Sequence, residues 1–353
     1  MNQREITFGQ AINEALMQAM AEDNSVYIIG EGVPDPKGIF GTTLGLREKF
    51  GSERVLDMPV AENGMTGVAI GSALMGMRPV LTHQRVDFAL LAMDQMVNNA
   101  AKWHYMFGGQ HSVPLVIRLI IGRGWGQGPQ HSQSLQSWFA HVPGLKVVMP
   151  TTPHDAKGLL LASIWDNNPV IFLEHRWLHN IVGHVPTESY TIALGEARVA
   201  RSGQDLTVVS TSYMTLEALR AATWLSVAGV EVEVIDVRSL RPLDAEAILA
   251  SVRKTGRLLV TDTSWTFCGF SAEIVALVAE KAFSHLLCPP CRVALPDTPT
   301  PTSHAMAQFY YPRAVDLYKA SCEMMGLPHS DVEPDILLSN QLDVPDKFFT
   351  GPF

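Results

Sequence analysis

Glu62 lies where an apolar, strand-like run gives way to a glycine-rich and almost uncharged helical pattern, within residues 57–67. A carboxylate at such a junction is either a solvent-facing acid at a helix N-terminus or a buried functional acid. Periodicity alone favours the solvent-facing interpretation. A buried acid can share its proton with a bound ligand, so Glu62 is also a candidate for acid–base chemistry.

Two other segments bring polar side chains into loops of the same half of the chain. Residues 122–134 are rich in glycine and deliver His131 just ahead of an expected helix. Ligand loops have this composition because glycine lets the backbone approach a bound molecule closely. Residues 82–88 follow an expected strand, at the end where ligands of open α/β sheets bind. The three segments together predict one site.

The elements that must position these groups alternate between strand-like and helical patterns. A strand that is apolar on both faces, such as residues 26–30, belongs inside a parallel sheet. In the first half we expect further strands at 54–57, 79–82, 114–121, 147–149 and 170–174, and helices at 8–22, 64–77, 89–105 and 155–166. In the second half we expect strands at 205–210, 230–237, 257–261 and 291–294, and helices at 215–227, 245–254, 271–283 and 309–325. This alternation predicts the α/β class with mainly parallel sheets.

The chain length favours two domains, because 353 residues exceed what one hydrophobic core usually supports. The periodicity lapses into a polar stretch after His175, where we place the boundary. The prediction is a first domain at 1–182, a linker at 183–195, a second domain at 196–326 and an extended tail at 327–353.

The composition excludes several classes of protein. A net charge of −9 argues against a nucleic-acid-binding protein, and no apolar run approaches the length of a membrane span. Four cysteines fit a reducing compartment, so the predicted location is cytoplasmic. Charged residues make up 17%, against roughly 25% in an average soluble protein. This deficit predicts that other subunits cover part of the surface.

A series of short motifs carries a resemblance to a known family. In order, they are Gly30-Glu31 and residues 59–64, 92–102, 130–133, 143–148, 156–158, 166–169 and 236–244. From about Phe8 to Cys322 the chain resembles the beta subunit of the decarboxylating component of 2-oxo acid dehydrogenase complexes. This family has pyruvate, branched-chain and acetoin types and belongs to the transketolase-like thiamine diphosphate enzymes. The resemblance implies two three-layer α/β/α domains, a pyrimidine-binding thiamine diphosphate fold followed by a transketolase C-terminal-like domain.

The resemblance also implies roles for individual residues. Glu62 matches the glutamate that hydrogen-bonds the aminopyrimidine ring of the cofactor and activates it, and His131 matches the active-site histidine that donates a proton or orients the bound acyl group. Three further positions match residues at the cofactor, namely Glu31, Gln84 and Phe88, of which Phe88 packs on the aminopyrimidine. The positions matching a structural potassium site are Leu115, Ser163, Ile164, Asp166 and Asn168, although residues 166–169 could equally form a plain turn.

One motif of the wider family is missing. Thiamine enzymes of this kind bind the diphosphate and its magnesium through Gly-Asp-Gly followed by an Asn, and no Gly-Asp-Gly occurs in this chain. The resemblance therefore implies that an alpha subunit holds the diphosphate and most of the Mg²⁺ coordination. The expected assembly is an α2β2 heterotetramer that is active only with its alpha subunit.

Residues 82–88 depart from the pyruvate-type pattern, in which an acid and mostly apolar residues lead up to the Phe. Here His83 and Arg85 bring positive charge toward the cofactor, unless Arg85 pairs with Asp87 or a neighbouring subunit. Gly32 stands where many relatives carry a second acid. These departures leave the small 2-oxo acid substrate and the lipoyl acceptor open.

Three functions follow from these motifs. The first is decarboxylation of a 2-oxo acid with transfer of the acyl group to a lipoyl domain of an acyltransferase core. The second is a non-oxidative thiamine enzyme of two chains that transfers an acyl or ketol unit to a carbonyl acceptor. The third is a scaffolding subunit without catalysis, against which the joint presence of Glu62, Phe88 and His131 argues.

Overall fold

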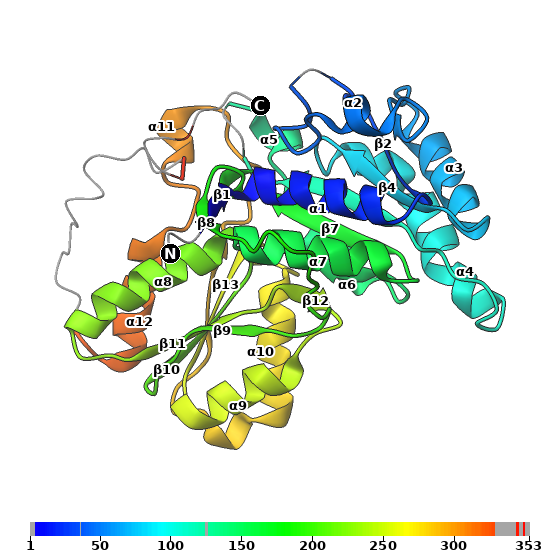
Figure 1. The fold of residues 1–353 in the computed structure, drawn as a ribbon. Helices are drawn as coiled ribbons and strands as arrows, with labels where there is room; N and C mark the ends of the chain where they lie inside the picture. Colours follow the sequence, from blue (N-terminus) through cyan, green and yellow to red (C-terminus); the bar gives the residue numbers. More distant parts are fainter. Residues whose placement is uncertain (1–3, 36, 124–125, 329–343, 346–348, 350–353) are drawn as a thin grey trace. The chain divides into compact units, whose positions relative to one another are not determined.

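Two compact units make up the computed structural model, which describes residues 4–35, 37–123, 126–328, 344–345 and 349 (Figure 1). The first unit contains residues 1–121, 138–194 and 240–242, and the second contains residues 122–137, 195–239 and 243–353. Both have helices packed on mainly parallel sheets, so the predicted α/β class is confirmed. The predicted linker at 183–195 stays a prediction, and most of the predicted tail at 327–353 lies outside the described residues.

The first unit is built on a seven-stranded sheet with the order β12-β6-β7-β5-β4-β2-β3. The pairs from β6 to β3 are all parallel, and β2, β5 and β7 are buried along their whole length, as expected of central parallel strands. The strands are β2 (Val26–Gly30), β3 (Val55–Leu56), β4 (Arg78–His83), β5 (Val116–Ile121), β6 (Lys146–Val148), β7 (Val170–His175) and β12 (Ser239–Arg241). A separate antiparallel pair joins β1 (Glu5–Thr7) to β8 (Val182–His184).

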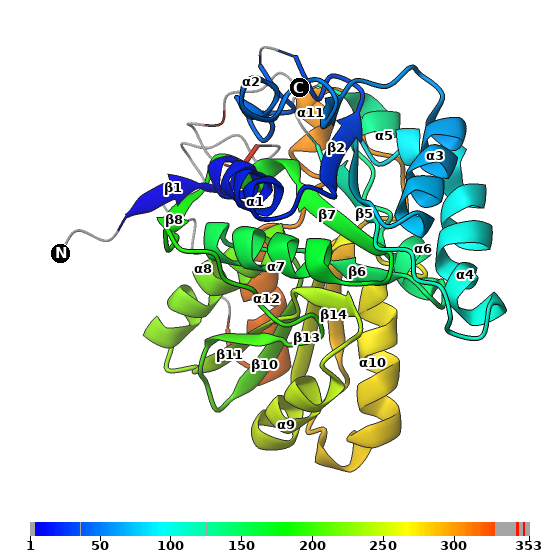
Figure 2. The ribbon, with the colours of Figure 1, turned by 45° about the vertical axis from the view of Figure 1, so that its right-hand side comes forward.

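Helices cover both faces of this sheet. Side chains at their N-termini define where two of them begin, because Thr7 caps α1 and Thr152 caps α7, each in a capping box. Helices α1 and α7 lie side by side on one face, and α3 and α4 lie on the other (Figure 2). The helical elements are α1 (Phe8–Glu22), α2 (Leu46–Phe50), α3 (Glu62–Leu74), η1 (Phe88–Ala92), η2 (Gln95–Ala100), α4 (Ala101–Met106), α6 (Gln136–His141), α7 (Pro153–Trp165) and η3 (Arg176–Leu178).

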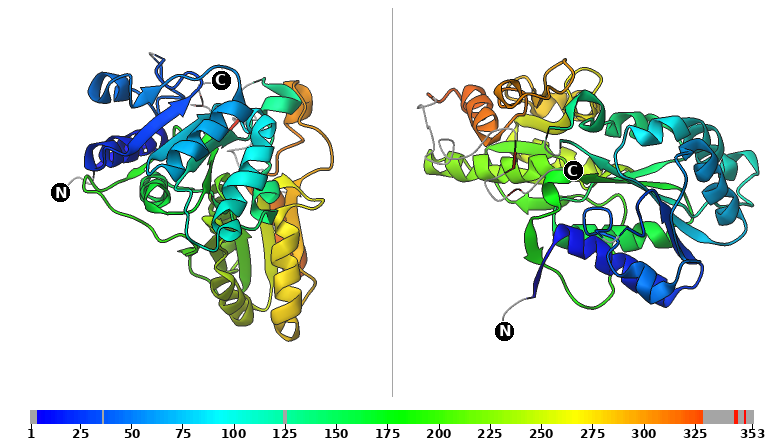
Figure 3. Two further views of the ribbon diagram at one scale, coloured as in Figure 1. Left: turned by 90° about the vertical axis from the view of Figure 1, so that its right-hand side faces the viewer. Right: turned by 90° about the horizontal axis from the view of Figure 1, so that it is seen from above.

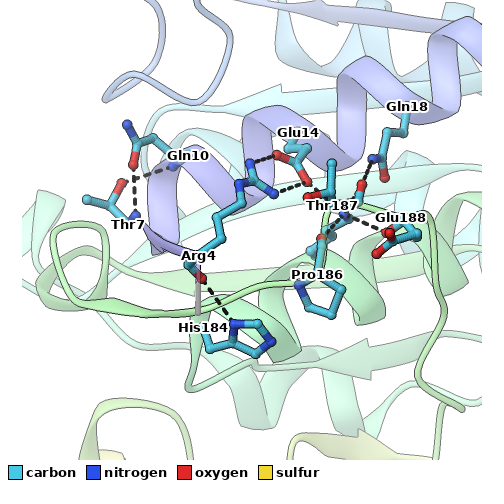
Figure 4. A network of polar contacts seen from close by, with 10 residues as sticks. Arg4, Thr7, Gln10, Glu14, Gln18, His184, Pro186, Thr187 and Glu188 are labelled. Carbon is cyan, nitrogen blue, oxygen red and sulfur yellow. Dashed lines mark hydrogen bonds and ion pairs between the residues drawn. The ribbon is translucent and has the colours of Figure 1, made fainter. Parts of the chain in front are cut away.

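The buried side chain of Lys157, on α7, joins α1 to the backbone of residues 186–188. The Lys157 side chain is fully buried, and its Nζ donates to Glu14 Oε1 at 2.7 Å. It also donates to three successive backbone carbonyls, those of Pro186, Thr187 and Glu188, at 2.7, 3.2 and 2.8 Å. Figure 4 shows Glu14 on α1 facing this stretch of backbone. One ammonium group therefore donates to four oxygens, of which Glu14 Oε1 also accepts from Arg4 and the Thr187 carbonyl also accepts from Gln18.

The second unit has a five-stranded sheet with the order β14-β13-β10-β11-β9, in which only β9 is antiparallel to its neighbour. Figure 3 shows the ribbon from two further sides. Helix α8 packs against α12, and α9 packs against α10. The strands are β9 (Arg198–Arg201), β10 (Leu206–Ser210), β11 (Val232–Asp236), β13 (Leu258–Trp265) and β14 (Cys291–Leu295). The helical elements are α5 (Gly128–His131), α8 (Tyr213–Val227), α9 (Ala245–Thr255), α10 (Phe270–Lys281), η4 (Phe283–His285), α11 (His304–Ala307) and α12 (Ala314–Met325). Every helix in the described part of the chain is too short or too polar to cross a membrane.

Candidate functional site

The carboxyl ends of β2, β3 and β4 bring together most of the predicted cofactor-binding residues. Glu31 directly follows β2, Gln84 directly follows β4, and Glu62 is the first residue of α3. The Gln84 side chain donates from Nε2 to the backbone carbonyl of Glu31 at 3.1 Å. Parallel strands end at a common edge, which is how three residues so far apart in sequence share one place.

Two carboxyl groups lie in contact at this edge. Burial raises the pKa of Glu31, and the neighbouring Glu62 and Asp57 raise it further, including a hydrogen bond with Glu62 that favours the protonated form. Glu62 is only 2% exposed. Within the described residues, Oε1 of Glu31 and Oε1 of Glu62 are buried without a hydrogen-bond partner. The buried interpretation of Glu62 therefore holds over the solvent-facing one that periodicity favoured.

Asp57 belongs to this group, although sequence reasoning did not select it. Its Oδ1 accepts hydrogen bonds from the backbone nitrogens of Gly32 and Met58, both at 3.0 Å. It follows β3 as Glu31 follows β2, and this shared position after a strand is the signal that could have identified it.

The chain reverses direction after Glu31 with the help of two glycines. A Cβ on Gly30 would lie 2.3 Å from the carbonyl oxygen of Thr82, so only glycine lets β2 approach β4 this closely. Gly32 has a φ of +69°, and a Cβ there would lie 2.7 Å from Gln84 Nε2. Gly32 therefore leaves room for the Gln84 amide, and its positive φ would strain any other residue at this position.

Replacing Glu31 by Gln is expected to raise the thermal midpoint of unfolding at about pH 8 and to leave it unchanged at about pH 3. The pKa of Glu31 is higher in the folded chain than in the unfolded one, so ionising it above that pKa costs folding free energy. At low pH both states hold the proton and the cost disappears. Calorimetry at the two pH values checks this, with the exposed Glu53→Gln as control. A lower midpoint for Glu31→Gln at the higher pH would contradict it.

The segment after β4 carries a different charge from the one expected. His83 is buried at the end of β4, and burial lowers its pKa to about 4, so it is neutral at pH 7 and the predicted positive charge on it is wrong. Arg85 is also buried, and its guanidinium lies 5.5 Å from the ring centre of Phe40. The guanidinium of Arg176, just past β7, lies 4.5 Å from the same ring. Buried positive charge at this edge thus comes from two arginines.

Phe88 begins η1 and is half-buried. Its backbone nitrogen donates to the carbonyl of Arg85 at 3.3 Å, and η1 packs against α3, the helix that begins at Glu62. The predicted contact of Phe88 with an aminopyrimidine ring stays a prediction.

His131 belongs to the other unit. It is the last residue of the short helix α5 and is half-buried. Residues 122–137, which carry it, group with the second unit although their neighbours in sequence on both sides belong to the first. Sequence position alone assigned His131 to the first domain.

The five predicted potassium ligands lie in the last turn of α7 (Ser163 and Ile164), in the turn that follows it (Asp166 and Asn168) and directly before β5 (Leu115). Arg78 Nη1 donates to the carbonyls of Ile164 and Asp166 at 3.0 and 3.1 Å, and the carbonyl of Leu115 accepts from Val170 N at 2.9 Å. The remaining two predicted ligands are engaged locally, through Ser163 Oγ to Leu159 O at 2.7 Å and Asn168 N to Asp166 Oδ1 at 2.8 Å. A potassium ion would share two of these oxygens with a guanidinium group, so the site stays a prediction.

The carboxyl edge of the first unit fits the pyrimidine half of thiamine diphosphate. A buried carboxyl oxygen without a partner, such as Glu62 Oε1, is costly unless a ligand supplies a hydrogen bond. A ring nitrogen is such a partner. Residues that could hold this ring are Glu62, Glu31 and Phe88. No group of three or more His, Cys, Asp or Glu side chains in the described residues could hold a metal ion.

Comparison with known proteins agrees with this geometry. Family models described as the transketolase pyrimidine-binding domain and the transketolase C-terminal domain match residues 4–180 and 195–317. The chain is 42% identical to the acetoin:2,6-dichlorophenolindophenol oxidoreductase subunit beta of Bacillus subtilis (strain 168), over 92% of this chain and 98% of that protein. It is also 42% identical to the mitochondrial pyruvate dehydrogenase E1 component subunit beta-2 of Oryza sativa subsp. japonica, over 90% of this chain and 86% of that protein.

A solved structure has the same fold. It is described as a split gene transketolase, inactive beta4 tetramer, and superposes with a TM-score of 0.74 at 22% identity, covering 92% of this chain and 99% of that one. The resemblance drawn from the motifs is confirmed. The chain belongs to the transketolase-like family of E1 beta subunits that includes those of pyruvate and acetoin dehydrogenases.

Proposed function

We propose that this chain is the beta subunit of an α2β2 thiamine diphosphate enzyme that decarboxylates a small 2-oxo acid and passes the acyl group to a lipoyl acceptor. The observation that carries the proposal is the contact of Glu62 and Glu31 at the carboxyl edge of the first unit, with a buried and unpartnered oxygen on each. The names of the relatives, subunits of pyruvate and acetoin enzymes, support the substrate class.

The chemistry of this chain centres on a proton held at Glu62. When bound, thiamine diphosphate supplies the carbon that attacks the 2-oxo acid and the electron sink for decarboxylation. Glu62 would share a proton with a ring nitrogen of the bound cofactor, in a site where little water competes for the bond. Burial and the neighbouring Glu62 and Asp57 raise the pKa of Glu31 beside it, which favours the protonated form of that carboxyl. His131 orients the acyl group or donates a proton to it.

Buried positive charge supports an anionic substrate. Arg85 follows Gln84 in sequence, and both Arg85 and Arg176 are buried at the carboxyl edge of the sheet. A cation in a low-dielectric site attracts a carboxylate far more strongly than one in water. These two arginines therefore favour a 2-oxo acid over a neutral ketone.

The alpha subunit is required because this chain lacks Gly-Asp-Gly, the motif that holds the diphosphate and magnesium. Large apolar side chains on the first unit support an extensive contact with other subunits, since Met75 and Tyr105 are 85% and 88% exposed.

We place Mg²⁺ mainly on the alpha subunit and potassium, if bound, at the turn after α7. The cytoplasm is the proposed location, and docking to a lipoyl acyltransferase core is the proposed higher assembly.

The purified chain alone is expected to show no decarboxylation, and the chain mixed with its alpha subunit is expected to acylate a lipoyl domain from a 2-oxo acid. Mass spectrometry of the lipoyl domain, with pyruvate and a branched-chain 2-oxo acid as alternative substrates, measures the product. Full activity of a monomer would contradict the two-subunit site. Carbon–carbon ligation without any lipoyl acylation would instead establish the non-oxidative transferase.

A further inference from the structure

We infer that Gln136 and Asp262 form a positioning contact for His131, by fixing the segment 122–137 that carries this side chain onto the sheet of the second unit. The inference rests on the proposed function in one respect, namely that His131 is the active-site histidine. Gln136 and Asp262 are positioning residues and not catalytic ones, since both act through His131.

Asp262 is a buried carboxylate surrounded by neutral donors. It lies on β13 with 1% of its surface exposed. Oδ1 accepts from Gln136 Nε2 at 2.7 Å, Thr211 Oγ1 at 2.9 Å and the backbone nitrogen of Thr263 at 2.8 Å, and Oδ2 accepts from Ser264 Oγ at 2.6 Å. A polar group in the interior is costly unless partners surround it, and four donors satisfy this carboxyl group.

Gln136 is the member of this network that comes from the His131 segment. Its side chain is fully buried, and Nε2 donates both to Asp262 and to Thr263 Oγ1, the latter at 3.1 Å. The other three donors lie on β13 or in the turn that follows β10. The hydrogen bond from the Gln136 amide to Asp262 therefore links the segment that carries His131 to β13.

The segment is also attached near its other end. Arg123 Nη2 donates to the carbonyl of Thr302 at 3.3 Å, and a Cβ on Gly128 would lie 2.9 Å from Thr302 Oγ1. His131 lies between this hydrogen bond and close approach on one side and Gln136 on the other, five residues before the amide. A segment held on both sides of a side chain places that side chain reproducibly, and a displacement of about 1 Å can cost about 100-fold in rate.

The test compares Gln136→Met, which keeps the side-chain volume but removes the donor, with Gln136→Glu, which sets a second carboxylate against Asp262. In the reconstituted α–β enzyme we expect kcat to fall by about tenfold or more, with the KM for the 2-oxo acid within about twofold of the wild type. Gln308→Glu is the matched control, because Gln308 is an exposed glutamine whose side chain donates to the carbonyl of Ala305 nearby. It should leave kcat unchanged.

A double-mutant cycle with His131→Ala shows whether Gln136 acts through His131. In the His131→Ala background, Gln136→Met should lower kcat little further, because the side chain that it positions is already absent. If Gln136→Met lowers kcat by the same factor in both backgrounds, the positioning inference is overturned while the role of His131 stands. If His131→Ala alone leaves kcat unchanged, the proposed role of His131 fails. Circular dichroism and thermal unfolding identify any variant that has not folded, and the milder Gln136→Met then decides the question.

Discussion

Glu62→Gln in the reconstituted α–β enzyme is expected to lower kcat by about 100- to 10,000-fold. Glutamine keeps the size of the side chain and can still form a hydrogen bond, but it cannot share a proton with the ring that faces it. Glu62 is buried beside Glu31, so bulk water has little access to it and cannot replace it in that proton transfer. Steady-state kinetics with a saturating 2-oxo acid measure the effect.

Two controls separate a chemical effect from a structural one. Glu48→Gln changes an exposed glutamate on α2 and should leave kcat unchanged. Calorimetric titration with thiamine diphosphate should show that the Glu62→Gln enzyme still binds the cofactor, with its affinity changed far less than its kcat. Unchanged turnover by Glu62→Gln would remove this residue from the mechanism and revive the scaffolding hypothesis.

Lys157→Met is expected to lower the free energy of unfolding of the first unit by about 3–5 kcal/mol. The substitution removes the one donor shared by the carbonyls of Pro186, Thr187 and Glu188 and leaves Glu14 without its buried cation. Lys157 and Arg4 together hold the pKa of Glu14 below its usual value, even though burial of that carboxyl opposes them. Urea denaturation followed by tryptophan fluorescence measures the loss.

Lys102→Met is the matched control for this prediction. Lys102 also donates from Nζ to a backbone carbonyl, that of Pro143 at 2.7 Å, but this bond is exposed to solvent. Its loss should change stability by no more than about 0.5 kcal/mol. Equal effects of the two substitutions would show that burial of the Lys157 ammonium contributes nothing.

Hydrophobic periodicity predicted the parts of the fold that are buried on both faces. The strand predicted at 26–30 and the helix predicted at 8–22 have the bounds that the structure shows, because a continuous apolar run and a regular apolar stripe leave few alternatives. The antiparallel strand β9 was missed because most of its residues are half-buried and two of its four are arginines. The helix predicted over 89–105 is broken into η1, η2 and α4, since local propensity does not encode such changes of pitch.

The candidate site was predictable as a set of residues but not as a geometry. The family resemblance predicted Glu31, Glu62 and Gln84 as cofactor-binding residues. Only the structure shows that Gly32 makes room for the Gln84 amide. The contacts of Arg78 with the turn after α7 join residues 86 or more positions apart, and no periodic signal carries such a pairing. The placement of residues 122–137 in the second unit was unpredictable for the same reason.

Residues 122–137 belong to the second unit and residues 240–242 belong to the first, although their neighbours in sequence belong to the other unit. This arrangement has a consequence for synthesis on the ribosome. The first unit is completed only by residues 240–242, and its sheet gains the edge strand β12 from residues 239–241. Domains generally fold from the N-terminus as they emerge, yet here the last strand of the first sheet follows more than half of the chain. During translation β6 therefore remains an open edge until β12 emerges, a period in which the nascent chain is exposed to strand-to-strand aggregation.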